Sequence, residues 1–158
     1  MRIGYGEDSH RLEAGLPLVI GGVPIEGSPL GAVAHSDGDV LLHALADSLL
    51  SAFALGDIGH YFPPSDPALR GLPGEQIVAH VLGLLAQQGE VRIGNVAAVV
   101  TLDTPKLGEY RERIQESVAR CLGVRPGRVG VTFKTSEGAA TGHIQARVSL
   151  LLSVMQGA

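Results

Sequence analysis

Residues 36–53 read SDGDVLLHALADSLLSAF, the clearest helical stretch of the chain. Ser36 and Asp39 have the spacing of a capping box, which favours a helix start at this point. The apolar residues that follow recur at helical spacing, and they are Leu41, Leu42, Leu45, Leu49 and Phe53. Gly56 is typical of a position just beyond a helix end. The stretch therefore predicts the first helix of the fold.

The segments before this helix predict strands. Arg2–His10 has the alternating character of a strand, and Leu16–Ile20 and Val23–Ile25 flank the pair Gly21-Gly22. Two short apolar runs around a glycine pair indicate a hairpin. We expect a loop over 27–34 to connect this hairpin to the helix.

After the helix, residues 57–74 predict a long loop rich in Gly, Pro and Asp. Loops of that length in a compact domain are usually functional or disordered. The remaining expected elements are helices over 75–88 and 110–122 and strands over 91–102, 129–136 and 144–155. This order predicts an α+β fold with a mixed sheet of four to five strands and helices on one face.

Composition narrows the class of protein. The 158 residues predict a single domain over 1–158. The chain has 12 Lys+Arg and 16 Asp+Glu, a net charge of −4, and no basic run, so we expect neither nucleic acid nor a membrane as partner. Charged residues make up 18%, against about 25% in typical domains, so the surface is sparsely charged for a monomer.

Compartment signals are few. Cys121 is the single cysteine, which excludes a disulfide framework and suits a reducing compartment. The N-terminal residues turn acidic at once and contain no apolar core segment, unlike a signal or transit peptide. Apolar stretches are short and interrupted, so none is expected to span a bilayer. We therefore expect a cytoplasmic protein.

Three residues have the character of metal ligands. Asp8 and His10 lie two apart in a predicted strand, so both side chains leave the same face. His43 lies on the first helix between Asp39 and Asp47 at four-residue spacing, a pattern that orients an imidazole for a metal. If strand and helix meet, Asp8, His10 and His43 form a triad with one open position, as in catalytic zinc sites. The same spacing also fits a chance Asp-x-His pair and a surface ion-pair stripe.

Other residues have the character of phosphate ligands. His35 and Ser36 precede the first helix, and helix N-termini favour anions. The two lysines of the chain, Lys106 and Lys134, both fall at strand ends beside Thr, Ser or Gly. Ammonium, hydroxyl and amide groups together suit a diphosphate, and the nearby Glu137 suits Mg²⁺. Two solvated lysines on turns remain the plainer alternative.

The loop over 55–66 combines glycine hinges with aromatic and acidic residues. This composition suits a lid that closes over a polyol. An ordinary surface connection fits the same residues.

Together these segments resemble one family, the 2-C-methyl-D-erythritol 2,4-cyclodiphosphate synthases. The matching segments are Arg2–His10, His35–Leu45, Leu55–Gly59, Phe62-Pro63, Gly94–Val96, Pro105-Lys106 and Thr135–Glu137. They cover essentially the whole chain in order. The resemblance implies a homotrimer with active sites between subunits.

The resemblance also implies a reaction. The substrate is 4-diphosphocytidyl-2-C-methyl-D-erythritol 2-phosphate, whose 2-phosphate oxygen attacks the β-phosphorus of the diphosphate. CMP leaves, and the cyclic diphosphate of the non-mevalonate isoprenoid pathway forms. A zinc-dependent phosphohydrolase is the alternative enzyme, and a trimeric binding protein without activity is the alternative from another class.

Residue roles follow from the resemblance position by position. Asp8, His10 and His43 match the ligands of a zinc ion, and Glu137 matches a ligand of Mg²⁺ or Mn²⁺ on the diphosphate. His35 and Thr135 match groups that stabilise the transition state. The positions that match substrate contacts are Asp8, Ser9, His10, His35, Ser36, Asp57, Ile58, Gly59, Phe62, Asp66, Asp103, Thr104, Pro105, Lys106, Leu107, Lys134, Thr135, Ser136 and Glu137. Pro64 stands where the family usually has an acidic lid residue, and His143 stands where it commonly has an arginine near the trimer axis.

Overall fold

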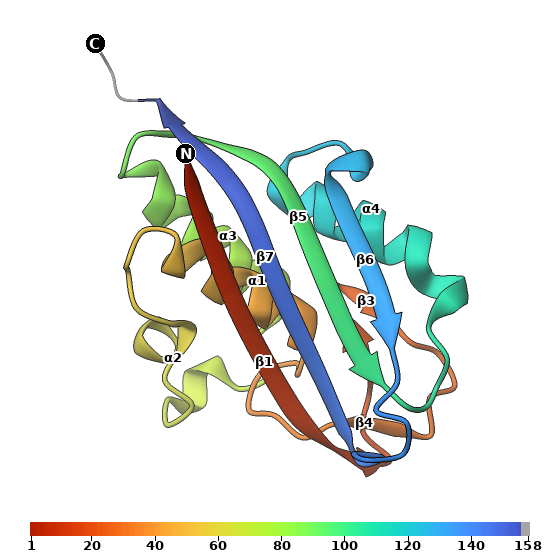
Figure 1. Ribbon diagram of the computed structural model, residues 1–158. Coiled ribbons are helices and arrows are strands. Elements are labelled where there is room, and N and C mark those ends of the chain that lie inside the picture. The colour runs from red at the N-terminus through yellow and green to blue at the C-terminus, as the bar shows by residue number, and fades with distance from the viewer. Residues whose placement is uncertain (156–158) are drawn as a thin grey trace.

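A five-stranded sheet forms the framework of the computed structural model, which describes residues 1–155 (Figure 1). Its strands, in spatial order, are β4 (Leu30–Ala32), β1 (Arg2–Ala14), β7 (His143–Met155), β5 (Glu90–Leu102) and β6 (Val129–Lys134). The β5–β6 pair is parallel and the other pairs are antiparallel. β2 (Val19–Ile20) and β3 (Val23–Pro24) form a separate two-stranded ribbon. The predicted α+β class with a mixed sheet is confirmed.

The main helices lie on one face of the sheet, behind it in Figure 1. They are α1 (Val40–Ser51), α3 (Gly74–Ala86) and α4 (Arg111–Leu122), while the short α2 (Ile58–Tyr61) lies beside β1. Short 3₁₀ turns occupy Pro67–Leu69, Gly108–Tyr110 and Pro126–Arg128. The helices bury a continuous apolar core against this face, including Leu41, Leu45, Leu49, Val100 and Leu152.

Three segments differ from the sequence expectations. The expected loop over 57–74 contains the helix α2 and a 3₁₀ turn. The first strand continues to Ala14, beyond the expected end at His10, and the expected loop over 27–34 contains β4. Leu12, Glu13 and Ala14 pair with this short strand. The pairing partner lies far along the chain, so local composition did not reveal it.

The start of α1 also differs from expectation, because the N-cap is Asp39 and not Ser36. The Asp39 carboxylate accepts hydrogen bonds from the backbone N–H groups of Leu41 and Leu42. It accepts two more from Gly21 and Gly22 in the turn between β2 and β3. One fully buried side chain therefore starts α1 and fastens the ribbon to it.

Glycine in β1 lets α1 lie directly on the strand. A Cβ atom built at Gly6 would lie 2.2 Å from the Ala44 carbonyl oxygen and 2.5 Å from the Ser48 nitrogen, both in α1. Real Cβ atoms do not approach backbone atoms so closely, so a side chain here would push the helix away. The close approach brings the side chains of β1 next to those of α1.

Gly6→Ala is expected to lower the free energy of unfolding by about 1–3 kcal/mol, because the added methyl group overpacks the strand–helix contact. Urea denaturation followed by circular dichroism measures this change. Gly83→Ala is the matched control, since Gly83 lies in α3 with open space around its Cβ position. The control should be neutral or stabilising by up to about 1 kcal/mol, as helix propensity predicts. Equal stability of Gly6→Ala and the wild type would contradict the close contact.

Among the described residues, the helices are too short or too polar to cross a membrane.

Candidate metal centre

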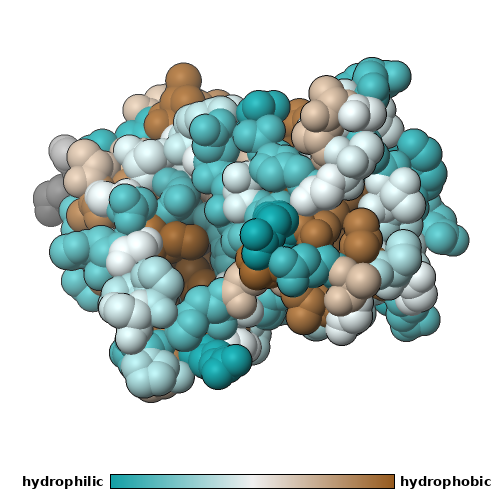
Figure 2. Space-filling model, turned by 90° about the horizontal axis from the view of Figure 1, so that it is seen from below, coloured by the Kyte–Doolittle hydropathy of each residue, from teal (hydrophilic) through white to brown (hydrophobic). Residues whose placement is uncertain are grey.

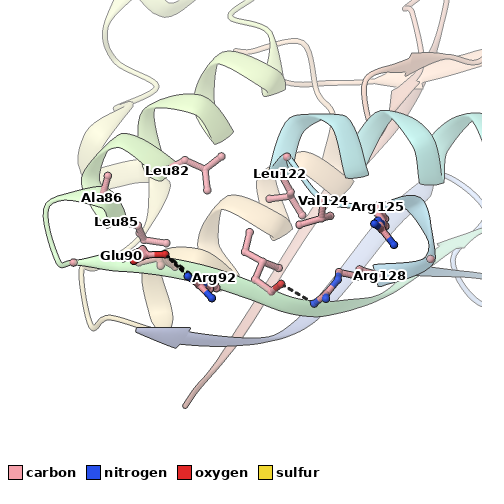
Figure 3. Close-up of a pocket in the computed structure, with 14 residues that line it drawn as sticks. Leu82, Leu85, Ala86, Glu90, Arg92, Leu122, Val124, Arg125 and Arg128 are labelled. Carbon is pink, nitrogen blue, oxygen red and sulfur yellow. Dashed lines mark hydrogen bonds and ion pairs between the residues drawn. The ribbon is translucent and has the colours of Figure 1, made fainter. Parts of the chain in front are cut away.

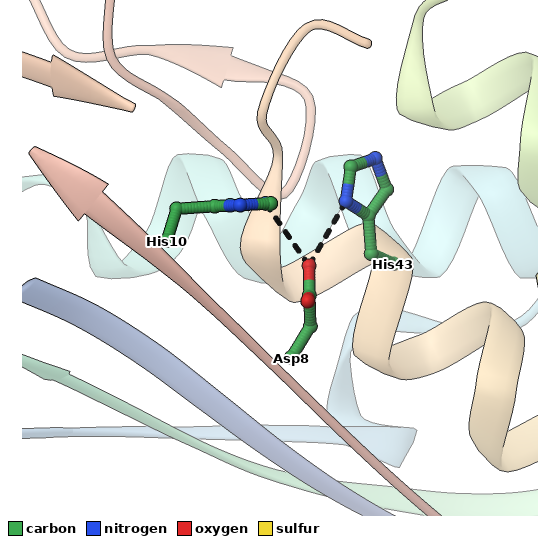
Figure 4. Close-up of side chains that lie close together, drawn as sticks. All are labelled: Asp8, His10 and His43. Carbon is green, nitrogen blue, oxygen red and sulfur yellow. Dashed lines mark hydrogen bonds and ion pairs between the residues drawn. The ribbon is translucent and has the colours of Figure 1, made fainter. Parts of the chain in front are cut away.

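Three side chains from β1 and α1 converge on one point (Figure 4). The Asp8 Oδ2 atom lies 3.0 Å from His10 Nε2 and 3.0 Å from His43 Nδ1. One potential ligand atom from each residue lies within 4.8 Å of the others. The predicted meeting of strand and helix is therefore confirmed.

Local geometry explains why these side chains meet. Asp8 and His10 follow Gly6 on the same face of β1, because side chains of a strand alternate between its faces. His43 lies on the side of α1 that covers this strand, and it is only 3% exposed. The close strand–helix contact at Gly6 thus continues directly into a polar site.

The donor set fits a metal ion. His10 Nε2 is buried and, within residues 1–155, has no hydrogen-bond partner, although Asp8 lies close to it. An unpaired buried nitrogen aimed at a carboxylate and a second imidazole is suited to a cation between them. Two imidazole nitrogens and one carboxylate oxygen form an N/N/O set.

The far side of the His43 ring is held by the segment before α1. Ser36 Oγ lies 3.2 Å from His43 Nε2, and an Asp37 oxygen lies 3.7 Å from the same atom. With a cation bound between His43 and Asp8, a proton kept on Nε2 would be shared with these acceptors, which would leave Nδ1 free to bind the cation. Asp37 was missed by the sequence interpretation, which assigned the orienting role to Asp39 and Asp47.

That assignment to Asp39 and Asp47 is wrong. Asp39 accepts only backbone N–H groups, and Asp47 accepts the backbone N–H of Ile58 at 2.7 Å. Asp39 therefore caps α1, while Asp47, which lies within α1, fastens the first residue of α2 to that helix, and neither carboxylate orients the His43 ring. The expected anion site at the start of α1 is also corrected, because Asp39 already occupies the N–H groups of Leu41 and Leu42.

Charges in the site favour ionised Asp8 and protonated His43. Burial opposes ionisation of Asp8, but the nearby imidazole of His10 and the hydrogen bond and charge of His43 outweigh it and hold the pKa of Asp8 well below its usual range. Burial likewise opposes protonation of His43, but its hydrogen bond to Asp8 and the charges of Asp8, Asp39 and Asp37 raise its pKa.

Metal affinity is expected to rise with pH. A cation must displace the proton from His43, and the raised pKa strengthens this competition. Zinc affinity of the metal-free protein should therefore increase by up to about tenfold per pH unit between about pH 6 and pH 8. Chelator competition at several pH values measures it. In Asp8→Asn, the loss of the carboxylate should weaken zinc binding and shift the rise of zinc affinity to lower pH. A zinc affinity of the wild type that does not change with pH would contradict the assignment of His43 as a metal ligand.

A cavity of about 320 Å³ opens beside the triad. It is lined by Asp8, His10, Ala34, His35, Ser36, His43, Ile58, Gly59, Phe62, Pro64, Leu69, Leu72 and Ile77. His35 Nε2 lies 2.9 Å from the Asp66 carbonyl oxygen, so the loop before α1 and the loop after α2 are joined at this cavity. Five predicted substrate contacts outside the triad, His35, Ser36, Ile58, Gly59 and Phe62, thus share one cavity with it.

The apolar half of this cavity was missed by the sequence interpretation. Its residues are apolar and belong to no catalytic or binding motif, so their sequence spacing does not predict a place in the cavity: Ala34, Leu69, Leu72 and Ile77. Pro64 had been noticed only as a departure from a family pattern, and the structure places it in the cavity wall.

A second cavity, of about 290 Å³, contains another set of predicted residues. Lys106 and Leu107 after β5 line it together with Lys134 and Thr135 at the end of β6. These loops meet because β5 and β6 are parallel neighbours, and Asp103 accepts a 2.7 Å hydrogen bond from the Ser136 hydroxyl. The second cavity shares no residue with the first.

The other predicted contacts line neither cavity within the described part of the chain. They are Ser9, Asp57, Asp66, Asp103, Thr104, Pro105, Ser136 and Glu137. Glu137 accepts a 2.9 Å hydrogen bond from Thr135 and lies outside the Asp8–His10–His43 group. Asp57 caps the short helix α2 through the His60 N–H.

Fold and site together define a single-chain α+β unit with an open two-histidine, one-carboxylate centre between a strand and a helix. The chain belongs to the YgbB family, whose model matches residues 1–153.

Two relatives and one solved structure illustrate the likeness. The chain is 59% identical over 151 residues to the 2-C-methyl-D-erythritol 2,4-cyclodiphosphate synthase of Deinococcus radiodurans, covering 96% of this chain and 93% of that protein. It is 54% identical over 152 residues to a synthase of the same name from Thermus thermophilus, covering 96% and 99%. A solved structure of such a synthase in a CDP-bound form has 50% identity and a TM-score of 0.90, with 96% and 100% covered.

Proposed function

We propose that the chain converts 4-diphosphocytidyl-2-C-methyl-D-erythritol 2-phosphate to 2-C-methyl-D-erythritol 2,4-cyclodiphosphate, with release of CMP. The relatives above are named as synthases of this cyclic product, and one is described with CDP bound. The observation that carries the proposal is the convergence of Asp8, His10 and His43 on a cavity that also contains His35 and Ser36. Catalytic and substrate-binding groups then lie together, as a phosphoryl transfer requires.

The reaction is an internal displacement at phosphorus. A bond forms between the 2-phosphate oxygen and the β-phosphorus, and the bond from that phosphorus to the oxygen of the CMP phosphate breaks. The electron pair leaves with CMP, so no water is consumed and no protein nucleophile is needed. The class is therefore a cyclising phosphorus–oxygen lyase, which needs positioning and charge stabilisation more than covalent work.

Asp8, His10 and His43 would hold a divalent cation, with Zn²⁺ suited to their nitrogen and oxygen atoms. Glu137 would hold Mg²⁺ or Mn²⁺ together with the diphosphate, since hard cations prefer oxygen ligands. When bound, these cations supply electrostatic stabilisation of charge on the phosphate oxygens.

The remaining groups bind and orient the substrate. His35 and Ser36 face the metal-centre cavity and are suited to the 2-phosphate. Lys106, Lys134 and Thr135 line the second cavity, which suits the cytidine diphosphate portion. Hydrogen bonds from His35 and Thr135 would stabilise charge that develops in the transition state.

We propose that the protein is a homotrimer with active sites between subunits and that it acts in the cytoplasm; the separation of the two halves of the site supports the shared active sites. One chain separates its metal-centre cavity from its lysine-containing cavity, and a neighbouring copy can supply the missing half. Apolar areas reach the surface at the lower end of the molecule, as seen in Figure 2. The open face of the sheet carries Ile3 and Tyr5, which are 76% and 50% exposed. A second and third copy would bury this apolar surface.

In solution the protein is expected at about three times the 16.4 kDa of one chain. The physical reason is the burial of the open sheet face against identical neighbours. Light scattering after size exclusion measures the mass. Ile3→Lys places a charge on this face and should shift the mass toward one chain, whereas Leu16→Lys, another exposed apolar position, should not. A monomeric wild type would contradict the shared site.

Phosphorus NMR of the protein with the cytidyl substrate, Zn²⁺ and Mg²⁺ tests the reaction. We expect equal amounts of CMP and the cyclic diphosphate, with no oxygen-18 from labelled water in either product. Label in the released phosphate products would indicate hydrolysis instead. Absence of CMP would refute the proposal.

A further inference from the structure

A large groove lies away from the candidate metal centre (Figure 3). It has a volume of about 1180 Å³ and runs between the C-terminal ends of α3 and α4, over the first residues of β5. Its lining shares no residue with either cavity described above. Nothing in the proposed reaction uses it.

The walls of this α3–α4 groove are apolar. Leu82 and Leu85 come from α3, and Leu122 and Val124 come from the end of α4 and the residues after it. In Figure 3 these side chains approach from opposite sides of the groove. Leu82 and Val124 are partly exposed and offer an apolar ligand a contact surface on two sides, while Leu85 and Leu122 lie almost fully buried beneath them.

The rim of the groove is positively charged. Three of the chain's arginines line it, although the chain as a whole has a net charge of −4. Arg92 is paired with Glu90 at 2.7 Å. Arg128 donates to the backbone carbonyl of Gly94 at 2.7 Å, and Arg125 has neither an ion pair nor a side-chain hydrogen bond within residues 1–155. Two guanidinium charges at the rim are thus not neutralised by a carboxylate.

We propose that the α3–α4 groove binds an amphiphilic organic anion, with its apolar body between Leu82 and Val124 and its anionic group at Arg125 and Arg128. Guanidinium groups match carboxylate, sulfonate and phosphate oxygens through paired N–H donors. Apolar walls with a few convergent polar groups are the usual lining of small-molecule sites, and the volume lies slightly above their usual range. The site is independent of the proposed reaction, so either can fail without the other.

Fluorescence titration with 1-anilinonaphthalene-8-sulfonate, an aromatic sulfonate, tests the proposal on the full chain. We expect saturable binding that weakens by about tenfold in Arg125→Gln, because one charge-assisted contact is lost. The uncharged N-phenyl-1-naphthylamine should bind more weakly and should not respond to Arg125→Gln. Ala86→Phe, which fills the groove from an exposed position at the end of α3, should exclude the probe.

Arg113→Gln is the matched control, because it removes the same charge from an exposed position of α4 outside the groove. It should leave the affinity within about twofold. Unchanged affinity in both Arg125→Gln and Ala86→Phe, with folding verified by circular dichroism, would overturn the proposal. An equal loss of probe affinity in Arg113→Gln and Arg125→Gln would also overturn the proposal, because the net charge of the protein alone would then explain the binding. A third result would also overturn the proposal: the wild type does not bind the probe, and Ala86→Phe has a lower mass in solution than the wild type. The groove would then be a contact with a second copy of the chain.

Discussion

His43→Ala is expected to lower kcat/KM for CMP release by on the order of 10³-fold, because the metal contributes several kcal/mol of charge stabilisation. Zinc content should fall from about one ion per chain to near zero, since only two ligands remain for an ion that usually has three or four from protein. Metal analysis after dialysis and the phosphorus NMR assay measure the two effects. They should fall together, because the same imidazole would hold the metal.

His60→Ala is the control for this variant. His60 is exposed on α2, and its side chain makes no hydrogen bond within residues 1–155. Its zinc content and its rate should both stay close to those of the wild type. Since His43 is almost fully buried, circular dichroism must show that His43→Ala remains folded. A folded His43→Ala protein that keeps both zinc and CMP release would refute the metal assignment.

Asp39→Ala is expected to lower the free energy of unfolding by about 2–4 kcal/mol, because the change removes a helix cap and leaves buried donors without their acceptor. The Asp39 carboxylate serves four backbone N–H groups, two at the start of α1 and two in the turn at Gly21 and Gly22. Alanine leaves these donors without their acceptor, and buried donors without partners are costly. Chemical denaturation measures the loss.

Asp39→Asn keeps the shape of the side chain but changes the hydrogen bonds that it can accept. Its carbonyl oxygen can keep the contacts of Oδ1 with Gly21, Leu41 and Leu42, while its amide group would face the Gly22 N–H. The cost should therefore lie between the wild type and Asp39→Ala. Ser36→Ala removes the side chain that the sequence pattern suggested as the cap. A larger loss of stability in Ser36→Ala than in Asp39→Ala would contradict the observed capping.

Much of the fold follows from local patterns. The apolar spacing after Asp39 predicts α1, and β-branched runs predict β5 and β6, because helix and strand periodicity depend on neighbours within a few residues. Parallel pairing of β5 and β6, and pairing of β4 with β1, join residues far apart along the chain. No local pattern specifies such partners.

The capping error has the same origin. Ser36 and Asp39 both have residue types that cap helices, and spacing favoured Ser36. Asp39 caps because the turn at Gly21 and Gly22 folds against it and supplies two more donors. Sequence spacing contains no information on that distant turn.

Local sequence is enough to define the chemistry of the metal centre: an Asp-x-His pair on one face of a strand, and a histidine on the first helix. Tertiary packing is what brings these residues together, because Gly6 allows α1 to lie against β1 and places His43 within 3.0 Å of Asp8. Packing also places Ser36 and Asp37, and not Asp39 and Asp47, against the far side of the His43 ring. The α3–α4 groove depends wholly on tertiary structure, since its arginines and leucines come from separate elements and share no motif. Local interactions fix residue types and periodicity, whereas packing fixes which side chains face one another.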